Sequence, residues 1–518
     1  MAKESSKKYK LNYAQTFLIG FGFLASSLAW SIYNSQVPLI LDQRFALSTT
    51  VIGIIMTIDN FFGIIFQPLV GAWSDNTRTR IGRRMPWIAL GMPICAIAFS
   101  IIPLQDSLIY FMAAVIIFNL VMSLWRSPVI SLMPDVTPRP LRSQANGIIN
   151  LMGGLGSVLA FLVGGFLSDL RGDKFWAFFF ASAIIIISFV VLLVFVREPD
   201  ALVFRRAKGI PIKNSIATRW AEQSLKDVTQ ADKEHDEFLL IQFAEEAKKN
   251  QDIIDDIQAK EQDEEREPVE TTEREPLETT EHDLAEQDLA EKTERELVEA
   301  AKSEAEEEKL QGFDALRQLG KAERLSLVFI LFAILFWFMG YNAIETFFTL
   351  FATNTYDVTD GQATMMLTGF SLTFLVAAIP AGYIGAKLGR IKAIRIGLIG
   401  ITILFIPILF RPEQLILQML LIGGGLFWAL VNINSLPTVL EFASNKTIGA
   451  FTGYYYFFSF TAAIVSPILF GAIRDLSDSY NSLFIYAVTF FVLAMICMWN
   501  VHHGDAVVMN ETETEEIE

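Results

Sequence analysis

Twelve long apolar segments are the strongest constraint on how this chain can fold. A helix that crosses a bilayer needs about 20 mostly apolar residues, and only a helix or a closed barrel satisfies its backbone there. The predicted spans are 14–41, 49–74, 86–104, 107–134, 143–168, 175–196, 325–353, 361–387, 393–410, 414–440, 447–473 and 482–501. The sequence therefore predicts an all-α polytopic membrane protein with twelve transmembrane helices.

A long polar segment separates the sixth span from the seventh. Residues 226–310 hold 31 acidic against 11 basic side chains, while the whole chain has a net charge of −16. The centre of this segment repeats itself at 265–272 and 273–280 and has few aromatic residues, which is typical of a solvated spacer. The predicted parts are a six-helix half at 1–197, an acidic low-complexity insert at 198–320, a second six-helix half at 321–505 and an acidic tail at 506–518.

The scarce residue types exclude several functions. Cys95 and Cys497 lie inside apolar runs, and no histidine lies in a predicted span. We therefore expect no disulfide framework, no metal site, no cofactor and no enzymatic nucleophile–base pair in the membrane. Nucleic-acid binding is disfavoured, because no basic, aromatic-rich surface remains once the apolar segments are set aside. A cleavable signal peptide is not expected, since the first apolar run is too long for one.

Basic residues gather in alternate loops. Those near the first span and in the loops after the second, fourth and eighth spans are Lys7, Lys8, Lys10, Arg78, Arg80, Arg83, Arg84, Arg139, Arg142, Lys387, Arg390, Lys392 and Arg395. By the positive-inside rule, this pattern predicts that both termini and the insert are cytoplasmic. The expected location is the cell membrane, which the chain crosses many times.

The two halves resemble each other in sequence. At a constant offset of 306 the matching pairs are Asp135 and Glu441, Gly147 and Gly453, Gly165 and Gly471, and Asp169 and Asp475. Gly82-Arg83 likewise matches Gly389-Arg390 in the loop after the second span of each half. Both copies run in the same direction, which predicts two parallel six-helix repeats. Such repeats are typical of alternating-access transporters, whose site lies between the halves near the midplane.

Three ionisable side chains lie well inside predicted spans: Asp59, Arg126 and Glu345. A charge at mid-membrane costs at least about 2.5–3.5 kcal/mol, so such residues usually line a cavity and serve function. Side chains lean toward the N-terminus of their helix, which directs Arg126 and Glu345 toward the midplane and Asp59 outward. We therefore expect no direct pair between Asp59 and Arg126.

Polar and aromatic side chains recur on single helix faces around these charges. The predicted substrate-binding residues are Arg126, Asn119, Trp30, Tyr33, Asn34, Asn342, Glu345, Trp428 and Asn432. Aromatic faces, amides and a guanidinium suit a polyhydroxylated ligand such as a sugar. The asparagine amides are explained equally well by hydrogen bonds that hold neighbouring helices together.

A second group of charges lies at the predicted cytoplasmic helix ends. We expect Asp75, Arg83, Arg84, Asp135, Arg142, Arg390 and Glu441 to act as gate and helix-end electrostatics, and not as substrate ligands.

The sequence QPLVGAWSDNTRTRIGRRMPW at 67–87 resembles the loop between the second and third spans of the major facilitator superfamily. Its Arg-rich, Pro-terminated form is similar to that of the sucrose/proton symporters and the glycoside–pentoside–hexuronide cation symporters. RSPVISLMPD at 126–135, followed by RSQAN at 142–146, is similar to the fourth-span signature of the sucrose symporters. The resemblance implies the major facilitator fold and proton-coupled uptake of a di- or oligosaccharide or glycoside, with Arg126 in contact with the substrate. A monomer is the default for a fold whose site lies within one chain.

Two departures from these families concern the coupling ion. The sucrose symporters carry an aspartate eleven residues before the arginine, where this chain has Val115. Relatives that use sodium carry acids in the second span at positions that resemble Gly63 and Gln67 here. Proton coupling would therefore use Asp59 or Glu345.

Two other functions fit the same sequence. One is an amphiphile or drug exporter of the same fold, although residues 147–165 of the fifth span lack the proline common in such antiporters. The other is a membrane sensor that signals through the acidic insert.

Overall fold

The computed structural model describes residues 9–170, 174–212, 214–234, 319–443 and 447–503. The chain divides into two compact units, one of Met1–Val228 with Leu316–Glu518 and the other of Thr229–Ala315. Only residues 229–234 of the second unit are described. The predictions for the rest of the acidic insert and for the tail lie outside the described residues.

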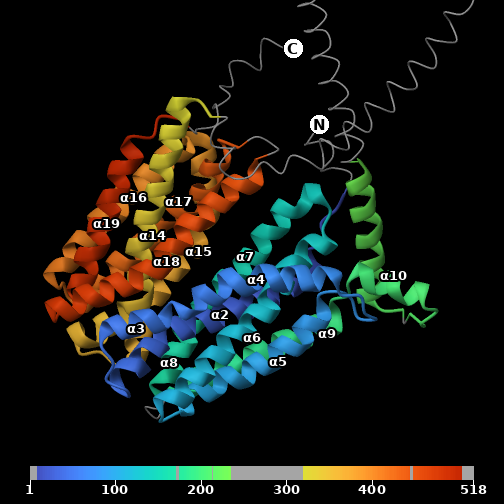
Figure 1. Cartoon of the computed structure of the whole chain (residues 1–518), viewed down its shortest axis with the longest axis horizontal. Helices are drawn as coiled ribbons and strands as arrows, with labels where there is room; N and C mark the ends of the chain where they lie inside the picture. The colour runs from blue at the N-terminus through green and yellow to red at the C-terminus, as the bar shows by residue number, and fades with distance from the viewer. Residues whose placement is uncertain (1–8, 171–173, 213, 235–318, 444–446, 504–518) are drawn as a thin grey trace, which may run out of the picture. The chain divides into compact units, whose positions relative to one another are not determined.

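The twelve predicted spans are confirmed. Twelve helices of the described chain are long and apolar enough to cross a membrane. The N-terminal half comprises α2 (Tyr13–Gln43), α3 (Thr49–Met56) with α4 (Ile58–Asn76), α5 (Met85–Ile101), α6 (Leu108–Val136), α7 (Arg142–Leu159) with α8 (Gly165–Ser168), and α9 (Phe175–Phe195). The C-terminal half comprises α14 (Lys321–Tyr356), α15 (Asp360–Leu388), α16 (Arg390–Phe405), α17 (Gln414–Leu440), α18 (Ile448–Ser477) and α19 (Ser482–Trp499). Figure 1 shows the first set in blue to green and the second in yellow to red.

Local side-chain chemistry sets where several helices begin and bend. Asn12 accepts a hydrogen bond from the Gln15 amide at 3.1 Å and so caps α2. The second span breaks at Thr57, whose hydroxyl donates to the Ile54 carbonyl at 2.7 Å and competes with the helix ladder. In the fifth span a π-helical turn, η3 (Ala160–Gly164), joins α7 to α8.

Two glycines form the turns that lead into the third span of each half. Gly82 precedes α5 with φ of 122°, and Gly389 precedes α16 with φ of 93°. Side chains rarely adopt this region, so glycine is required at both turns. A Cβ at Gly82 would also collide with the Glu198 carboxylate, whereas a hydrogen lets the loop approach it.

The two halves are joined at one end of the helices, which we call the closed end. There the Thr49 amide donates to Asp475 at 2.9 Å, and Lys174 pairs with Asp360 at 2.8 Å. At the opposite end, called the open end, lie the loops before α5 and α16. Figure 1 shows α3 beside α18 at the closed end.

The structure differs from the expected domain boundary at residue 197. The short helix α10 (Pro199–Ala207) and the helical residues 216–228 belong to the first unit, together with the membrane helices. Ala217 and Ala221 are buried, and the Ser224 hydroxyl donates to the Gln15 side chain at 3.3 Å. The sequence prediction missed this buried face of small residues because it treated the insert by its average acidic composition.

Candidate substrate cavity and gate

A cavity of about 840 Å³ lies between the two halves. Small-molecule sites typically occupy about 300–1,000 Å³. Its walls come mainly from α2, α6 and α7 on one side and from α14, α15, α17 and α18 on the other. Along α7 the lining runs from Ser157 to Asn146, a distance of about 16 Å at 1.5 Å per residue. The cavity therefore extends from the middle of the bundle toward the open end.

The two charges predicted to face the midplane both line this cavity. Asn34 on α2 donates to the Glu345 carboxylate on α14 at 3.3 Å, a bond that joins the two halves. The Arg126 guanidinium lies over the Trp30 ring, 5.9 Å from its centroid. Arg126 makes no hydrogen bond or ion pair with any residue that the structure describes, which leaves its N–H groups available to a ligand.

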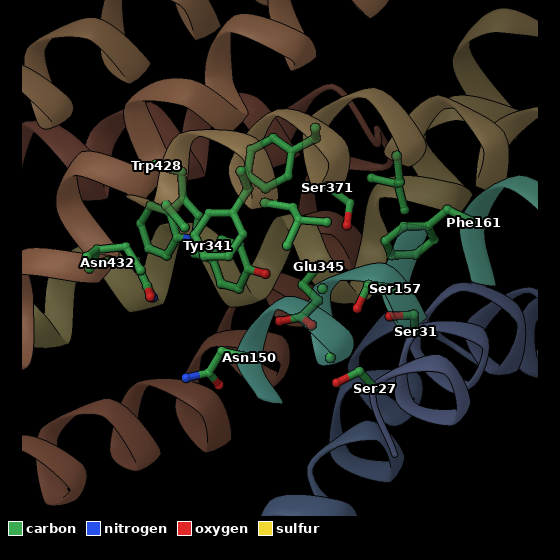
Figure 2. Close-up of a pocket in the computed structure, with 18 of the residues that line it drawn as sticks. Ser27, Ser31, Asn150, Ser157, Phe161, Tyr341, Glu345, Ser371, Trp428 and Asn432 are labelled. Carbon is green, nitrogen blue, oxygen red and sulfur yellow. The ribbon is translucent and has the colours of Figure 1, made fainter. Parts of the chain in front are cut away.

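An aromatic stack forms the wall next to Glu345. Tyr341 lies parallel to Trp428, with ring centroids 4.4 Å apart and planes 3° apart. Trp428 is 2% exposed, so Tyr341 presents the aromatic surface to the cavity. Figure 2 shows these two residues and Asn432 on one side of Glu345, with Ser27, Ser31 and Ser157 on the other.

Four of the predicted substrate residues lie outside the cavity lining. Tyr33 is fully buried and stacks on Phe118 with centroids 5.5 Å apart, and the Asn119 amide donates to its hydroxyl at 3.3 Å. The Asn342 amide donates to the Phe338 carbonyl in its own helix at 2.8 Å. Trp30 places its ring under the Arg126 guanidinium. Arg126, Asn34, Glu345, Trp428 and Asn432 are the predicted residues that reach the cavity.

Several polar residues in the lining were missed. They are Ser27 and Ser31 on α2, Asn146, Asn150 and Ser157 on α7, and Ser371 on α15. The spacing on α7 repeats one helix face and could have indicated them. The glycines between them were interpreted as close helix packing, so this polar face was overlooked. Tyr341 was also missed, although it lies four residues before Glu345 on the same face.

Asp59 lies apart from the cavity lining. It sits in the first turn of α4, directly after the break at Thr57, and accepts a hydrogen bond from the Asn60 amide at 2.7 Å. A carboxylate is favourable in the first turn of a helix. No ion pair joins Asp59 to Arg126, as the helix directions predict. Nowhere in the described ranges do three His, Cys, Asp or Glu residues form a metal-site cluster.

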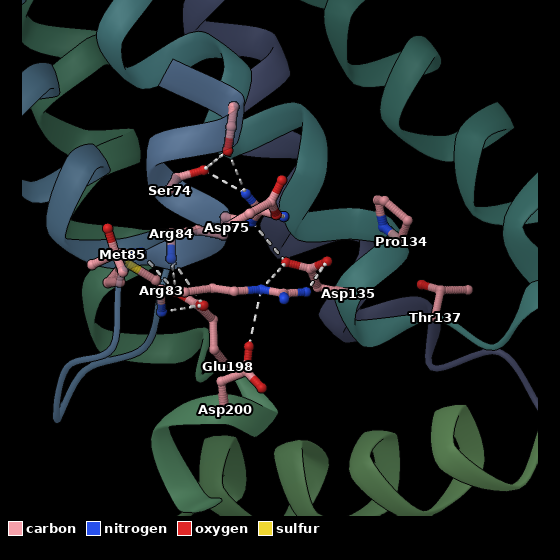
Figure 3. A network of polar contacts seen from close by, with 12 residues as sticks. Ser74, Asp75, Arg83, Arg84, Met85, Pro134, Asp135, Thr137, Glu198 and Asp200 are labelled. Carbon is pink, nitrogen blue, oxygen red and sulfur yellow. Dashed lines mark hydrogen bonds and ion pairs between the residues drawn. The ribbon is translucent and has the colours of Figure 1, made fainter. Parts of the chain in front are cut away.

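The predicted gate residues of the N-terminal half form one network at the open end (Figure 3). Arg83 pairs with Asp135 at 2.7 Å and with Asp200 at 2.9 Å. Arg84 pairs with the same Asp135 at 2.9 Å and also with Asp75. Asp135 therefore ties the loop before α5 to the end of α6.

Arg142 and the C-terminal half make related contacts. Arg142 donates to the carbonyls of Pro134 at 3.2 Å and Thr137 at 3.3 Å, which holds the end of α6. Arg390 pairs with Glu441 and donates to the Pro437 carbonyl at 3.2 Å. These contacts of Arg142 and of Arg390 each join residues of the same half.

Glu198 is a central member of the network that sequence reasoning missed. Its carboxylate accepts hydrogen bonds from the amides of Arg83 at 2.8 Å, Arg84 at 3.0 Å and Met85 at 2.6 Å. These are orphan donors at the start of α5. Burial raises the pKa of Glu198, while the three amides oppose that shift. Because 113 residues separate Glu198 from Met85, no local pattern reveals the contact.

We expect Glu198→Gln to lower the thermal stability of the purified protein. The amide offers one acceptor oxygen in place of two and turns an N–H group toward other donors. A buried unsatisfied donor costs about 1–3 kcal/mol. The temperature midpoint of unfolding in detergent measures the effect, and Glu222→Gln is the control because it changes a solvent-exposed ion pair with Arg206. An unchanged midpoint for Glu198→Gln would show that its three contacts add nothing to stability.

Comparison with known proteins identifies the fold. The model of the Major Facilitator Superfamily matches residues 19–359 and 330–506. A sucrose transport protein of Arabidopsis thaliana is 24% identical over 33% of this chain and 34% of its own length. An isoprimeverose transporter of Lactiplantibacillus pentosus is 22% identical over 40% of this chain and 47% of its own length. These matches span a third to a half of the relatives.

Solved structures cover the chain more completely. An inward-open structure of the xylose transporter XylE from E. coli has a TM-score of 0.59 at 13% identity, and covers 98% of this chain and 99% of its own. The nucleoside transporter NupG has a TM-score of 0.60 at 10% identity, and covers 94% of this chain and 100% of its own. Such low identities bear on the fold alone. With twelve membrane helices in two six-helix halves and a family model that matches most of its length, this chain belongs to the Major Facilitator Superfamily of transporters.

Proposed function

We propose that this chain is a secondary active transporter that takes up a sugar together with a proton by alternating access. The observation that carries the proposal is that Arg126 and Glu345 face one cavity between the two halves. An unpaired guanidinium offers fixed hydrogen-bond donors to a solute, and a carboxyl group can carry a proton. A charge at this depth is costly, so both residues are expected to serve the function.

The lining favours a di- or oligosaccharide or a glycoside as the solute. It offers an aromatic face at Tyr341, amides at Asn34, Asn150 and Asn432, and several serine hydroxyls. Aromatic rings pack on apolar faces while amides and hydroxyls bind hydroxyl groups. The names of the sucrose and isoprimeverose transporters among the relatives support the same class.

The direction of opening follows from the basic loops. Arg83, Arg84 and Arg390 lie at the open end, and the positive-inside rule places such loops in the cytoplasm. On this assignment the structure is the inward-facing state, both termini are cytoplasmic, and the membrane is the cell membrane. The cavity lies within a single chain, so a monomer suffices for transport.

Glu345 is the better candidate for proton coupling. It lines the cavity and bonds across the two halves to Asn34, so its protonation can affect both solute binding and the contact between halves. Asp59 accepts its hydrogen bonds from the backbone and side-chain amides of Asn60, at the start of its own helix. We therefore assign the coupling role to Glu345 and a helix-end role to Asp59.

Uptake into proteoliposomes tests the proposal. Labelled sucrose and maltose should accumulate above the external concentration when the outside is made acidic, and accumulation should stop when a protonophore collapses the gradient. Efflux of an amphiphilic dye driven by the gradient, without sugar uptake, would instead support an exporter. Equal internal and external sugar under a maintained gradient would contradict symport of these sugars.

Tyr341 provides a further test of the sugar site. We expect Tyr341→Ala to raise the sugar concentration for half-maximal uptake about tenfold, because an aromatic contact adds about 0.5–1.5 kcal/mol beyond its buried area. Tyr341→Phe keeps the ring and should stay within about twofold of the parent if the ring face makes the contact. Concentration series of labelled sugar measure both variants. Equal effects of the two substitutions would assign the contact to the hydroxyl instead.

A further inference from the structure

One wall of the substrate cavity is almost entirely apolar. The helix α15 lines the cavity with Ser371 and with six apolar residues, which are Leu367, Phe370, Phe374, Leu375, Ala378 and Ile379. These residues recur every three or four positions, so they occupy one face of the helix over about 18 Å. Most of the asparagine and serine side chains in the lining lie on α2 and α7 instead. The polar and apolar parts of the cavity therefore lie on different helices.

Two phenylalanines extend the stack of Tyr341 and Trp428 onto this apolar face. The Phe370 ring lies 6.4 Å from the Tyr341 ring, measured between centroids, with planes 33° apart. Phe374 follows one helical turn later, about 6 Å further along the axis. It packs against a buried, alanine-rich cluster between α15 and α17, which holds one side of the ring. Both rings are half-buried, so each still presents part of its surface to the cavity.

The apolar face lies next to the groups that are proposed to hold the sugar. Tyr341 flanks it on one side, and Tyr341 is four residues before Glu345 on the same face of α14. On its other side α15 packs against α7, since a Cβ on Gly154 would collide with the Leu375 side chain. A sugar bound beside Tyr341 therefore has the rings of α15 within reach of any group attached to it.

A sugar ring by itself makes poor use of this face. Among the α15 residues in the lining, Ser371 alone offers a hydrogen-bonding side chain, so most hydroxyl groups turned toward α15 would lack a protein partner. A buried donor or acceptor without a partner is unfavourable. A flat apolar ring, in contrast, removes its own surface and that of the phenylalanines from water, and it can stack on them.

We propose that Phe370 and Phe374 form a second subsite, which binds the aromatic aglycone of a glycoside. The solute that the cavity prefers is then an aryl glycoside, whose sugar contacts Arg126, Glu345 and Tyr341 while its aryl group packs along α15. The inference rests on the proposed sugar transport and goes beyond it, since it assigns the other part of the solute and the residues that select it.

Paired glycosides test the second subsite. The phenyl and methyl glycosides of glucose and of galactose, in both anomers, share the sugar and differ only in the aglycone. Isothermal titration calorimetry with the purified full chain gives the ratio of the two dissociation constants for each sugar. We expect the phenyl glycoside to bind at least about tenfold more tightly for the sugar that the site accepts, which corresponds to about 1.4 kcal/mol. The same phenyl glycoside should accumulate in proteoliposomes under an acid-outside gradient.

Variants of Phe374 assign the preference to α15. Phe374→Ser removes the ring and should bring the ratio to about one, and the methyl glycoside serves as the reference within the same variant. Phe374→Leu keeps an apolar side chain in case the serine variant does not fold, and it should lower the ratio at least about threefold. Phe427→Ala is the matched control, because Phe427 packs against the same buried cluster but lies outside the cavity lining. It should keep the ratio of the parent.

The outcomes separate this inference from the proposed function. Equal binding of phenyl and methyl glycosides by the parent would overturn the aryl subsite while leaving sugar transport in place. A parental ratio that persists in Phe374→Ser and Phe374→Leu would likewise overturn it. If no glycoside or disaccharide binds, both the subsite and the proposed sugar transport are overturned.

Discussion

Arg126→Ala is expected to abolish sugar accumulation while leaving the protein folded and inserted. Its guanidinium makes no protein hydrogen bond among the described residues, so removing it leaves no protein partner unsatisfied. A bound sugar would lose two charge-assisted hydrogen bonds worth about 1.5–3 kcal/mol each, which amounts to about 100-fold or more in affinity. The measurement is equilibrium binding of labelled sugar to purified protein, together with uptake under an acid-outside gradient.

Arg126→Lys separates charge from geometry at this position. Lysine keeps the positive charge but lacks the planar fork that binds two oxygens at once. We expect it to bind sugar as weakly as alanine does if paired hydrogen bonds matter, and to retain most affinity if charge alone matters. Asn119→Ala behind the cavity wall is the control for helix packing, since Asn119 lies outside the lining. Sugar binding by Arg126→Ala at the parent affinity would remove Arg126 from the site.

The sequence predicted those features that depend on a single helix. Length and apolarity specify a span by themselves, and a charge such as Arg126 or Glu345 stands out in any apolar run. Helix direction also predicted that both side chains lean toward the midplane, where the cavity lies. The internal repeat predicted the halves and the equivalent gate residues Arg83 and Arg390.

The features that were not predicted depend on how separate helices meet. Tyr341 belongs to the site because Trp428 of another helix supports its ring, and Tyr33 lies outside it because Phe118 covers it. The rotation of each helix about its axis decides whether Tyr341 or Tyr33 faces the cavity. That rotation cannot be derived from the residue pattern of a single span. Glu198 was missed because an acidic segment follows it and its partners lie far away in the chain. Burial and contact partners depend on the tertiary structure. The polarity of a side chain alone therefore could not show which of these residues belong to the cavity or the gate network.

Glu345→Gln is expected to uncouple transport from the proton gradient. Glutamine resembles the protonated acid in size and keeps an oxygen that can accept the Asn34 bond, but it cannot release a proton. The variant should still exchange labelled for unlabelled sugar across the membrane, because exchange needs no net proton movement. Accumulation under an acid-outside gradient should fall to the background of empty vesicles. Exchange by the variant should also be independent of pH, whereas we expect exchange by the parent to depend on it.

Asp59→Asn is the matched control, since it removes the other intramembrane carboxylate without touching the cavity lining. We expect it to keep gradient-driven accumulation within about threefold of the parent, because its loss affects one helix-end interaction of about 0.3–1 kcal/mol. The reverse result, accumulation by Glu345→Gln and none by Asp59→Asn, would transfer the coupling role to Asp59. The assignment thus depends on one structural difference: Glu345 lies in the cavity and bonds across the halves, whereas Asp59 bonds within its own helix.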